Sequence, residues 1–190
     1  SGDSITDFDL TKAIAFHKEK GSKATLVLTR VPNPLEFGVV ITNNSDRIVR
    51  FLEKPTTSEI FSDTVNTGIY ILEPSVLDYL PPDCEKDFSK DLFPLLLARE
   101  EPMYGYVAEG YWCDVGHLTA YRAAQYDALT GKVHLERSYP ENTQGIRIGK
   151  NTSISPSAKL HAPIPIGDNR RIGPRAELAA GTVAGATVNI

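Results

Sequence analysis

The stretch "KATLVLTR" at residues 23–30 decides the fold class, because it is a short apolar run of strand-forming residues. Such a run predicts a buried strand. The segment before it, residues 9–20, predicts a helix that ends at Gly21. One face of this helix is formed by Leu10, Ala13, Ile14 and His17. A helix that leads into a buried strand indicates an α/β protein.

The same alternation continues through the first two thirds of the chain. Two apolar runs, 37–42 and 47–53, flank the polar cluster Asn-Asn-Ser-Asp and predict a hairpin. Further strands are expected at 65–72 and 103–108, and further helices at 89–100 and 117–131. Pro94 is tolerable in a helix only near its first turn. The sequence therefore predicts an α/β domain over residues 1–131 with a mixed rather than purely parallel sheet.

The composition changes after Gly131, and residues 132–144 are predicted to form a linker. From residue 145 an aliphatic side chain recurs at every sixth position, a period that neither a helix nor a flat strand has. This hexapeptide repeat predicts a left-handed parallel β-helix over residues 145–190, which we expect to continue beyond Ile190. The series consists of Ile148, Ile154, Leu160, Ile166, Ile172, Leu178 and Ile190, with a lapse at Ala184.

Two residues depart from the repeat at its corners. The corner position lies four residues after each aliphatic residue and usually holds a small residue, as at Thr152, Ala158, Ala176 and Thr182. Ile164 and Arg170 occupy it instead, which puts the regularity of one corner in question. We expect Arg170 to point outward or to lie along a corner.

The composition excludes several classes of protein. The net charge of −4 argues against nucleic acid as a partner, since nucleic-acid-binding proteins usually show a basic patch or stripe. No apolar run is long enough to span a bilayer, and the N-terminus shows no targeting pattern. Cys84 and Cys113 lack a CxxC partner, and the histidines show no metal-ligand spacing. These features predict a cytoplasmic protein that binds neither nucleic acid nor membrane.

Four short motifs contain polar side chains that chemistry would use, and each also has a structural interpretation. Asp3, in the opening Gly-Asp pair, is either a metal ligand or a solvated turn residue. Glu53 and Lys54 in "FLEKP" lie at the end of a strand. They either bind a ligand or form a salt bridge that protects the edge of the sheet. Asn66 in "NTGIY" contacts a sugar hydroxyl or turns the chain. Asp114 in "GYWCDVG" lies among apolar neighbours and needs a cation or hydrogen-bond donors to stay charged.

Together and in this order, the four motifs resemble those of the sugar nucleotidyltransferases, most closely the bacterial mannose-1-phosphate guanylyltransferases. "FGVV" (37–40) matches a further segment of that family, and "FSKDLFPLLL" and "GYWCDVGHLTAYRAAQYDAL" favour the guanylyltransferase branch. Several such enzymes continue into a left-handed β-helix. The resemblance covers essentially all 190 residues. It implies that residues 1–131 are the C-terminal part of a Rossmann-like nucleotidyltransferase domain.

The resemblance also implies roles for particular residues. Asp3 and Asp114 would hold Mg²⁺ between them, and Lys54 would supply a positive charge to the sugar phosphate. These three are the implied catalytic residues. The implied substrate-binding residues are Gly38, through its backbone, with Glu53, Lys54 and Asn66.

The implied reaction transfers a nucleotidyl group, GMP from GTP, to mannose-1-phosphate and gives GDP-mannose and pyrophosphate. An oxygen of the sugar phosphate attacks the α-phosphorus of the triphosphate, so two anions must approach each other. The catalyst therefore mainly neutralises charge and aligns the reacting groups. Carboxylates from two separate loops around Mg²⁺ suit that task.

One expected segment is missing from the sequence. The family's glycine-rich nucleotide loop, of the type G-G-x-G-x-R-L, does not occur. We therefore expect the nucleotide-binding part to be absent from residues 1–190. Such a loop supplies much of the electrostatic stabilisation in phosphoryl transfer, so we expect the chain to be inactive alone.

Other functions stay open at this point. The nucleotide and the sugar are not fixed, so glucose-1-phosphate with dTTP, UTP or ATP is an alternative substrate pair. A second alternative is a non-catalytic subunit that senses a sugar phosphate. A third is a hexapeptide-repeat acyltransferase that uses acyl-CoA with His161 as its base, which leaves residues 1–131 unexplained. A homo-oligomer formed through the β-helix is also open.

Overall fold

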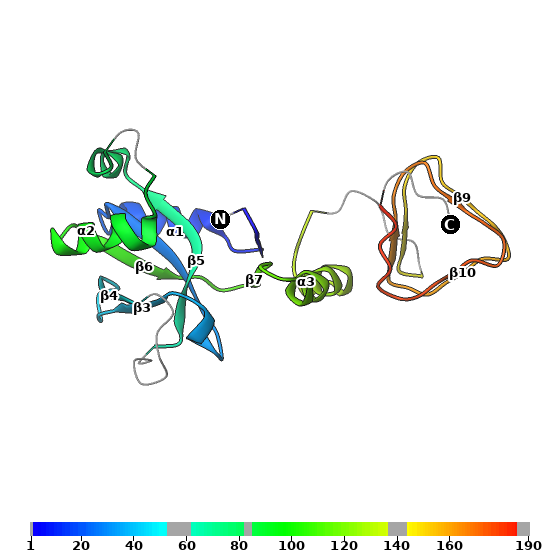
Figure 1. The fold of residues 1–190 in the computed structure, drawn as a ribbon, viewed down its shortest axis with the longest axis horizontal. Coiled ribbons are helices and arrows are strands. Elements are labelled where there is room, and N and C mark those ends of the chain that lie inside the picture. Colours follow the sequence, from blue (N-terminus) through cyan, green and yellow to red (C-terminus); the bar gives the residue numbers. More distant parts are fainter. Residues whose placement is uncertain (1, 53–61, 82–84, 137–143, 186–190) are drawn as a thin grey trace. The chain divides into compact units, whose positions relative to one another are not determined.

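The computed structural model divides the chain into two compact units, each with its own hydrophobic core. The first unit is Ser1–Asp114 and the second is Val115–Ile190. The structure describes residues 2–52, 62–81, 85–136 and 144–185 (Figure 1). Over this described part of the chain, every helix is too short or too polar to cross a lipid bilayer.

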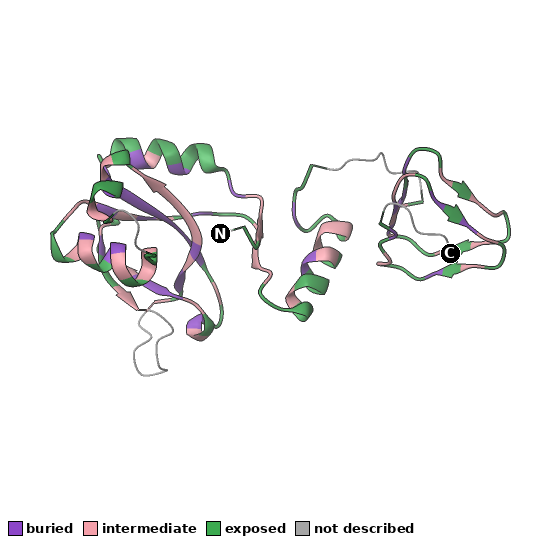
Figure 2. Ribbon diagram, turned by 45° about the horizontal axis from the view of Figure 1, so that its top comes forward, coloured by how far each residue is buried: buried purple, intermediate pink, exposed green. Residues whose placement is uncertain are grey.

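A five-stranded mixed sheet forms the centre of the described part of the first unit, in the strand order β4-β3-β5-β2-β6 (Figure 1). The predicted buried strand is β2 (Ala24–Arg30), and every residue of it except the last is buried. It pairs antiparallel with β5 (Thr64–Leu72) and parallel with β6 (Met103–Val107). Figure 2 shows buried residues along these central strands. The predictions of a buried strand and of a mixed α/β sheet are confirmed.

The predicted hairpin consists of β3 (Val39–Thr42) and β4 (Ile48–Leu52) at one edge of this sheet. Asn43 closes its turn, because its side-chain oxygen accepts hydrogen bonds from the backbone N–H groups of Ser45 and Arg47, each at 3.0 Å. Asparagine favours such turns because its side chain can replace a backbone acceptor.

Helix α1 (Leu10–Glu19) is the predicted first helix, and it contacts β2, β5 and β6. Asp9 caps its first turn, as the sequence pattern of a helix start requires. Nδ1 of the buried His17 lies 2.9 Å from Thr25 Oγ1. In the predicted apolar face, Ala13 and His17 are buried, whereas Leu10 and Ile14 are exposed.

The predicted helix at 89–100 is two elements, the π-helix η4 (Phe88–Leu92) followed by the α-helix α2 (Phe93–Ala98). Pro94 explains the break, because it lies in the first turn of α2 and has no N–H with which to continue an earlier helix. The two elements share the main core of the unit. This core contains Leu92, Phe93 and Leu96 together with Leu26 and Leu28 of the central strand.

Three shorter features belong to the described part of the first unit. The 3₁₀ helices η1 (Pro34–Glu36) and η3 (Pro74–Tyr79) each begin with a proline, whose fixed φ suits a first helical position. A two-stranded antiparallel ribbon pairs β1 (Ser4–Thr6) with β7 (Trp112–Asp114), apart from the main sheet.

Helix α3 (Leu118–Thr130) opens the second unit and is the predicted helix at 117–131. His117 caps its N-terminus, and Gly131 ends it at a φ of +80°, in the left-handed region that favours glycine. The predicted division into a domain, a linker and a repeat region, at 1–131, 132–144 and 145–190, stays a prediction.

Between residues 144 and 185 the second unit contains three two-stranded parallel sheets. Each residue in them pairs with the one eighteen positions later, so that β8 pairs with β11, β9 with β12 and β10 with β13. A coil of the predicted β-helix, with three faces of six residues each, would also repeat every eighteen residues. The left-handed β-helix itself stays a prediction. The strands are β8 (Ile146–Ile148), β9 (Ser153–Ile154), β10 (Lys159–Leu160), β11 (Ile164–Ile166), β12 (Arg171–Ile172) and β13 (Glu177–Leu178).

Arg170 was expected to point outward or to lie along a corner, and it does not point out into solvent, because only 2% of its surface is exposed. That it lies along a corner stays a prediction. Its backbone is bonded to the preceding repeat. The N–H donates to Thr152 Oγ1 at 3.4 Å, and the carbonyl accepts from the N–H of Ser153 at 2.8 Å. These bonds hold the backbone of the corner against the preceding repeat. The other irregular corner residue, Ile164, is also buried and joins the core of the repeats.

We predict that Ile172→Asp unfolds the repeat region. Ile172 is 1% exposed, and a buried carboxylate without a partner costs several kcal/mol. Thermal unfolding of the whole chain, followed by circular dichroism, should show a lower midpoint for this region. Ile148→Asp is the matched control, because it places the same charge at a repeat position that is 38% exposed. Equal effects of the two substitutions would contradict an inward-facing repeat.

Candidate functional site

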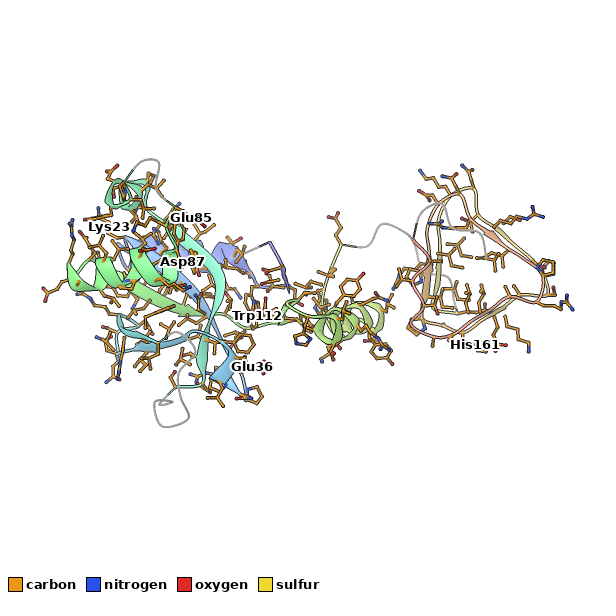
Figure 3. The ribbon with its side chains drawn as sticks, viewed as in Figure 1. Lys23, Glu36, Glu85, Asp87, Trp112 and His161 are labelled. Atoms are coloured by element: carbon orange, nitrogen blue, oxygen red, sulfur yellow. The ribbon has the colours of Figure 1, made fainter. Side chains whose placement is uncertain are left out.

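A cleft of about 210 Å³ lies in the first unit, where β5 meets the β1–β7 ribbon. We call it the Asn66 cleft. Figure 3 labels Glu36 and Trp112, which line it from η1 and from β7. The lining residues are Ser4, Glu36, Phe37, Gly38, Asn66, Thr67, Gly68, Ser89, Trp112 and Asp114. Three residues that the sequence singled out, Gly38, Asn66 and Asp114, therefore lie at one cleft although they are far apart in the chain.

A bulge in β5 shapes the floor of the Asn66 cleft. Opposite consecutive residues of β2, the pairing of β5 jumps from Ile69 to Asn66, so Thr67 and Gly68 are extruded from the ladder. Gly68 has a φ of +78°, where a side chain would be strained. Thr67 Oγ1 donates to the carbonyl of Val27 at 2.7 Å and so satisfies a buried acceptor. Bulges of this kind re-aim side chains next to functional sites.

The side-chain amide of Asn66 is held in one orientation. Its Oδ1 accepts the N–H of Gly68 at 3.0 Å, and its Nδ2 donates to the hydroxyl of Tyr70 at 2.9 Å. An amide offers two donors and two acceptor positions, so one of each is left for a ligand. The two bonds thus fix which way the amide presents them.

Gly38 lies directly beside Asn66. Its carbonyl accepts the backbone N–H of Asn66 at 2.8 Å, and the residue is buried at the start of β3. Because this bond continues the pairing of β3 with β5, it closes the cleft on one side. Contact between a sugar and the backbone of Gly38 stays a prediction.

The β1–β7 ribbon brings the two predicted metal ligands to one end of the same ladder. Asp114 is the partner of Ser4 in the register, and Asp3 is the residue before Ser4. Asp114 and Trp112 alternate with Cys113, so they share the face that lines the cleft. Asp3 is exposed and lies outside the lining residues. A metal ion shared by the two aspartates stays a prediction.

The residue types at this end of the ribbon fit Mg²⁺. The ion prefers oxygen ligands and usually binds one or two carboxylates, keeping several waters and substrate phosphates in its shell. Within the described residues, no three His, Cys, Asp or Glu side chains form a metal-binding group. A pair of aspartates that shares the ion with water and phosphate is compatible with that finding.

Other predicted residues lie elsewhere. Glu53 and Lys54 fall outside the described residues, so their roles stay predictions. His161 lies in the second unit, exposed beside β10, where its Nε2 is 3.0 Å from Glu177 Oε1. The exposed His161–Glu177 pair is a surface interaction.

Trp112 attaches the ribbon to the bulge. Its indole Nε1–H donates to the carbonyl of Thr67 at 3.3 Å. Its ring packs edge-on against Phe37, with the centroids 5.4 Å apart. The indole therefore forms a wall of the cleft and joins β7, η1 and β5.

Ser4, Glu36 and Ser89 also line the cleft, and none of them was predicted from the sequence. Ser89 comes from η4, whose first turn is capped by the carboxylate of Asp87. π-Helical turns are frequent at functional sites. The pattern Asp-x-Ser before an apolar run is a helix-start signal and would have located this cap, although not its place at the cleft.

Two ionisable side chains of the first unit, Asp91 in η4 and Tyr79 in η3, have shifted pKa values with separate causes. The backbone N–H of Asp87 donates to Asp91 at 2.9 Å, and Lys86 adds a second bond at 3.2 Å. Both bonds favour the charged form and lower the pKa of Asp91. In contrast, the hydrogen bond to Glu101, followed by desolvation, raises the pKa of Tyr79.

Residues 1–131 match the family model described as Nucleotidyl transferase. The UTP–glucose-1-phosphate uridylyltransferase of Synechocystis sp. is 36% identical over 175 residues, covering 90% of this chain and 45% of that protein. The mannose-1-phosphate guanylyltransferase of Mycobacterium tuberculosis is 32% identical over 179 residues, covering 94% of this chain and 49% of that protein. The chain thus spans about half the length of the curated relatives it matches.

A solved structure shows a similar fold. It is titled as a "Putative Glucose-1-Phosphate Thymidylyltransferase" from Bacillus anthracis in complex with sucrose. The similarity has a TM-score of 0.57 at 26% identity and covers 72% of this chain and 55% of the other. This likeness agrees with the mixed α/β sheet of the first unit.

We predict that Asp91→Asn destabilises the chain above about pH 4 and has a diminishing effect below it. A carboxyl whose folded pKa is lowered contributes stability above its unfolded pKa. That stability is lost as the pH falls through the folded pKa. Unfolding curves of both proteins between acid and neutral pH would measure the difference. Asp78→Asn, an exposed carboxylate on η3, is the control, and a pH-independent loss in Asp91→Asn would contradict the assignment.

Proposed function

The chain belongs to the nucleotidyl transferase family, and we propose that it forms the sugar-phosphate side of a sugar-1-phosphate nucleotidyltransferase site. One observation supports this proposal most: Gly38, Asn66 and Asp114 line a single cleft. An oriented amide and neighbouring backbone groups suit the hydroxyls of a sugar. A carboxylate at the same cleft suits a cation that accompanies a phosphate.

The proposed reaction is a nucleotidyl transfer. An oxygen of the sugar phosphate forms a bond to the α-phosphorus of a nucleoside triphosphate, the bond from that phosphorus to the bridging oxygen breaks, and pyrophosphate leaves with its electrons. Since both reactants are anions, binding them in line and neutralising their charge is most of the catalytic task.

Each side chain of the site has a role in this proposal. Asn66 donates and accepts one hydrogen bond each with the sugar, and the backbone of Gly38 limits how the sugar enters. Asp114, with Asp3, holds Mg²⁺. When bound, Mg²⁺ neutralises phosphate charge and holds the phosphate oxygens in place. Lys54 contributes a point charge to the sugar phosphate.

Mannose-1-phosphate and GTP are the substrates that we propose first. The segments around η4 and around β7 resemble the guanylyltransferase branch. Relatives of similar identity are named as a UTP–glucose-1-phosphate uridylyltransferase and a glucose-1-phosphate adenylyltransferase, so other substrate pairs are direct competitors. Glucose-1-phosphate with UTP, dTTP or ATP is therefore the alternative. We also propose that the repeat region is a left-handed β-helix.

A substrate panel tests the proposal. The natural full-length protein is given GTP, UTP, dTTP or ATP with mannose- or glucose-1-phosphate and Mg²⁺, and pyrophosphate release is measured. We expect the highest kcat/KM with GTP and mannose-1-phosphate. Asp114→Asn should lower it by about 100-fold or more, since lost charge stabilisation of the transition state costs several kcal/mol. Cys113→Ser, on the opposite face of β7, should change it little.

Two results would decide against the proposal. If no pair releases pyrophosphate while mannose-1-phosphate still binds, the chain is a sensor rather than a catalyst. If Asp114→Asn keeps a near-normal rate in Mg²⁺, then the carboxylate has a structural role only.

We predict that Tyr70→Phe raises the KM for the sugar phosphate by about three- to tenfold with little change in kcat. The substitution removes the acceptor that holds Asn66 Nδ2 at 2.9 Å, and the amide then loses its fixed orientation. The ring itself remains in its aromatic contacts with Phe88 and Phe93. Steady-state kinetics measures both constants. Tyr79→Phe is the control, because its hydroxyl bonds Glu101 away from the cleft; an equal rise in KM there would contradict the role of Tyr70.

A further inference from the structure

The β1–β7 ribbon has too few residues to fix its own register. Each of its strands, Ser4–Thr6 and Trp112–Asp114, is three residues long, and the ribbon is not part of the five-stranded sheet. An isolated two-stranded pair is marginally stable in water. Some other contact must therefore hold the strands in the observed alignment.

That contact lies at the end of the ribbon away from Asp114. The carboxylate of Asp7 accepts the backbone N–H of Tyr111 at 2.6 Å. The backbone N–H of Asp7 and the hydroxyl of Thr6 both donate to the Tyr111 carbonyl, at 3.3 and 2.8 Å. Both polar groups of the residue that precedes β7 are thus bonded to the residues at the end of β1.

Gly110 makes this close approach possible. Its φ is +130°, a conformation that other residues rarely adopt. A Cβ at this position would lie 2.7 Å from Asp7 Oδ1 and 3.3 Å from Phe8 Cδ1. The glycine therefore lets the carboxylate reach the next backbone N–H in the chain.

The register set at Tyr111 determines which side chain of β7 reaches the Asn66 cleft. Side chains alternate along a strand, so Trp112 and Asp114 face the cleft and Cys113 faces away. A slip of one residue would exchange Cys113 for Asp114 at the cleft. Trp112 could no longer bond the bulge of β5 in the same way.

We propose that Asp7 is a positioning residue that holds the register of the β1–β7 ribbon and thereby presents Asp114 to the metal and the substrate phosphate. The inference rests on the proposed function for the role of Asp114. Asp7 acts through the backbone of Tyr111 and does not itself contact the substrate. Its acceptor oxygen, rather than its charge alone, is the essential group.

Three variants of the natural full-length protein test this role. Asp7→Ala removes the acceptor, and Asp7→Asn keeps an acceptor oxygen with a weaker hydrogen bond. Asp9→Ala is the matched control. It removes a nearby carboxylate that caps α1, and Asp9 makes no bond to Tyr111. The readouts are amide hydrogen exchange at Tyr111, Mn²⁺ binding followed by electron paramagnetic resonance, and the Mg²⁺ dependence of pyrophosphate release.

We expect Asp7→Ala to speed exchange at Tyr111 and to weaken Mn²⁺ binding and raise the half-saturating Mg²⁺ concentration by about tenfold. Asp7→Asn should change both constants by about threefold or less, with a smaller rise in exchange. Asp9→Ala should leave all three readouts near those of the wild type. If Asp7→Ala does not fold, the graded change in Asp7→Asn still tests the proposal, and unchanged exchange at Tyr111 there overturns it.

Other outcomes also overturn the proposal. One is that Asp7→Ala behaves like the wild type in exchange and metal binding. Another is that Asp7→Asn is as impaired as Asp7→Ala, since charge would then matter rather than the bond to Tyr111. If the wild-type protein releases no pyrophosphate with any substrate pair, the proposed function fails. Exchange at Tyr111 and Mn²⁺ binding still decide the role of Asp7 separately.

Discussion

The bulge of β5 at Thr67 and Gly68 is the constraint on which the cleft depends. It interrupts the ladder with β2, and Thr67 Oγ1 donates to the carbonyl of Val27 beside the interruption. The extruded Thr67 carbonyl in turn accepts the indole N–H of Trp112. The same two residues therefore re-aim Asn66 and attach β7 to the central sheet. The bulge therefore shapes the cleft and attaches the ribbon to it, whereas the register within the ribbon decides which side chain of β7 faces the cleft.

The sequence could predict the elements that depend on local pattern. The apolar run at 23–30 is a buried strand because its pattern requires burial whatever surrounds it. The turn after β3 and the end of α3 follow from Asn43 and Gly131, whose side-chain and backbone chemistry act within a few residues. The period of six is also visible in the sequence, and three faces of six residues equal the observed pairing offset of eighteen. Asn66 was identified from its motif, but the bulge that aims it was not.

The features that the sequence could not predict depend on contacts between distant segments. The register of the β1–β7 ribbon is set by Asp7 and Tyr111, which lie more than a hundred positions apart. Arg170 is buried although a charged side chain is usually exposed, and its charge alone could not indicate this. The position of Ser89 depends on where η4 packs, although its helix cap was visible in the sequence. Pattern along the chain carries little information about such long-range partners.

The two sides of the cleft are held by different kinds of interaction. Asp114 is placed by backbone register, which admits discrete alternatives only, because a slip by one residue turns its side chain away. Glu36 and Ser89 instead come from η1 and η4, two short helices with separate side-chain caps from Asn33 and Asp87. A substitution at either lining residue is therefore expected to change the shape and hydrogen bonding of the cleft while the bonds between β1 and β7 remain. In the proposed reaction the sugar preference can therefore change while the carboxylate that serves the phosphate stays in place.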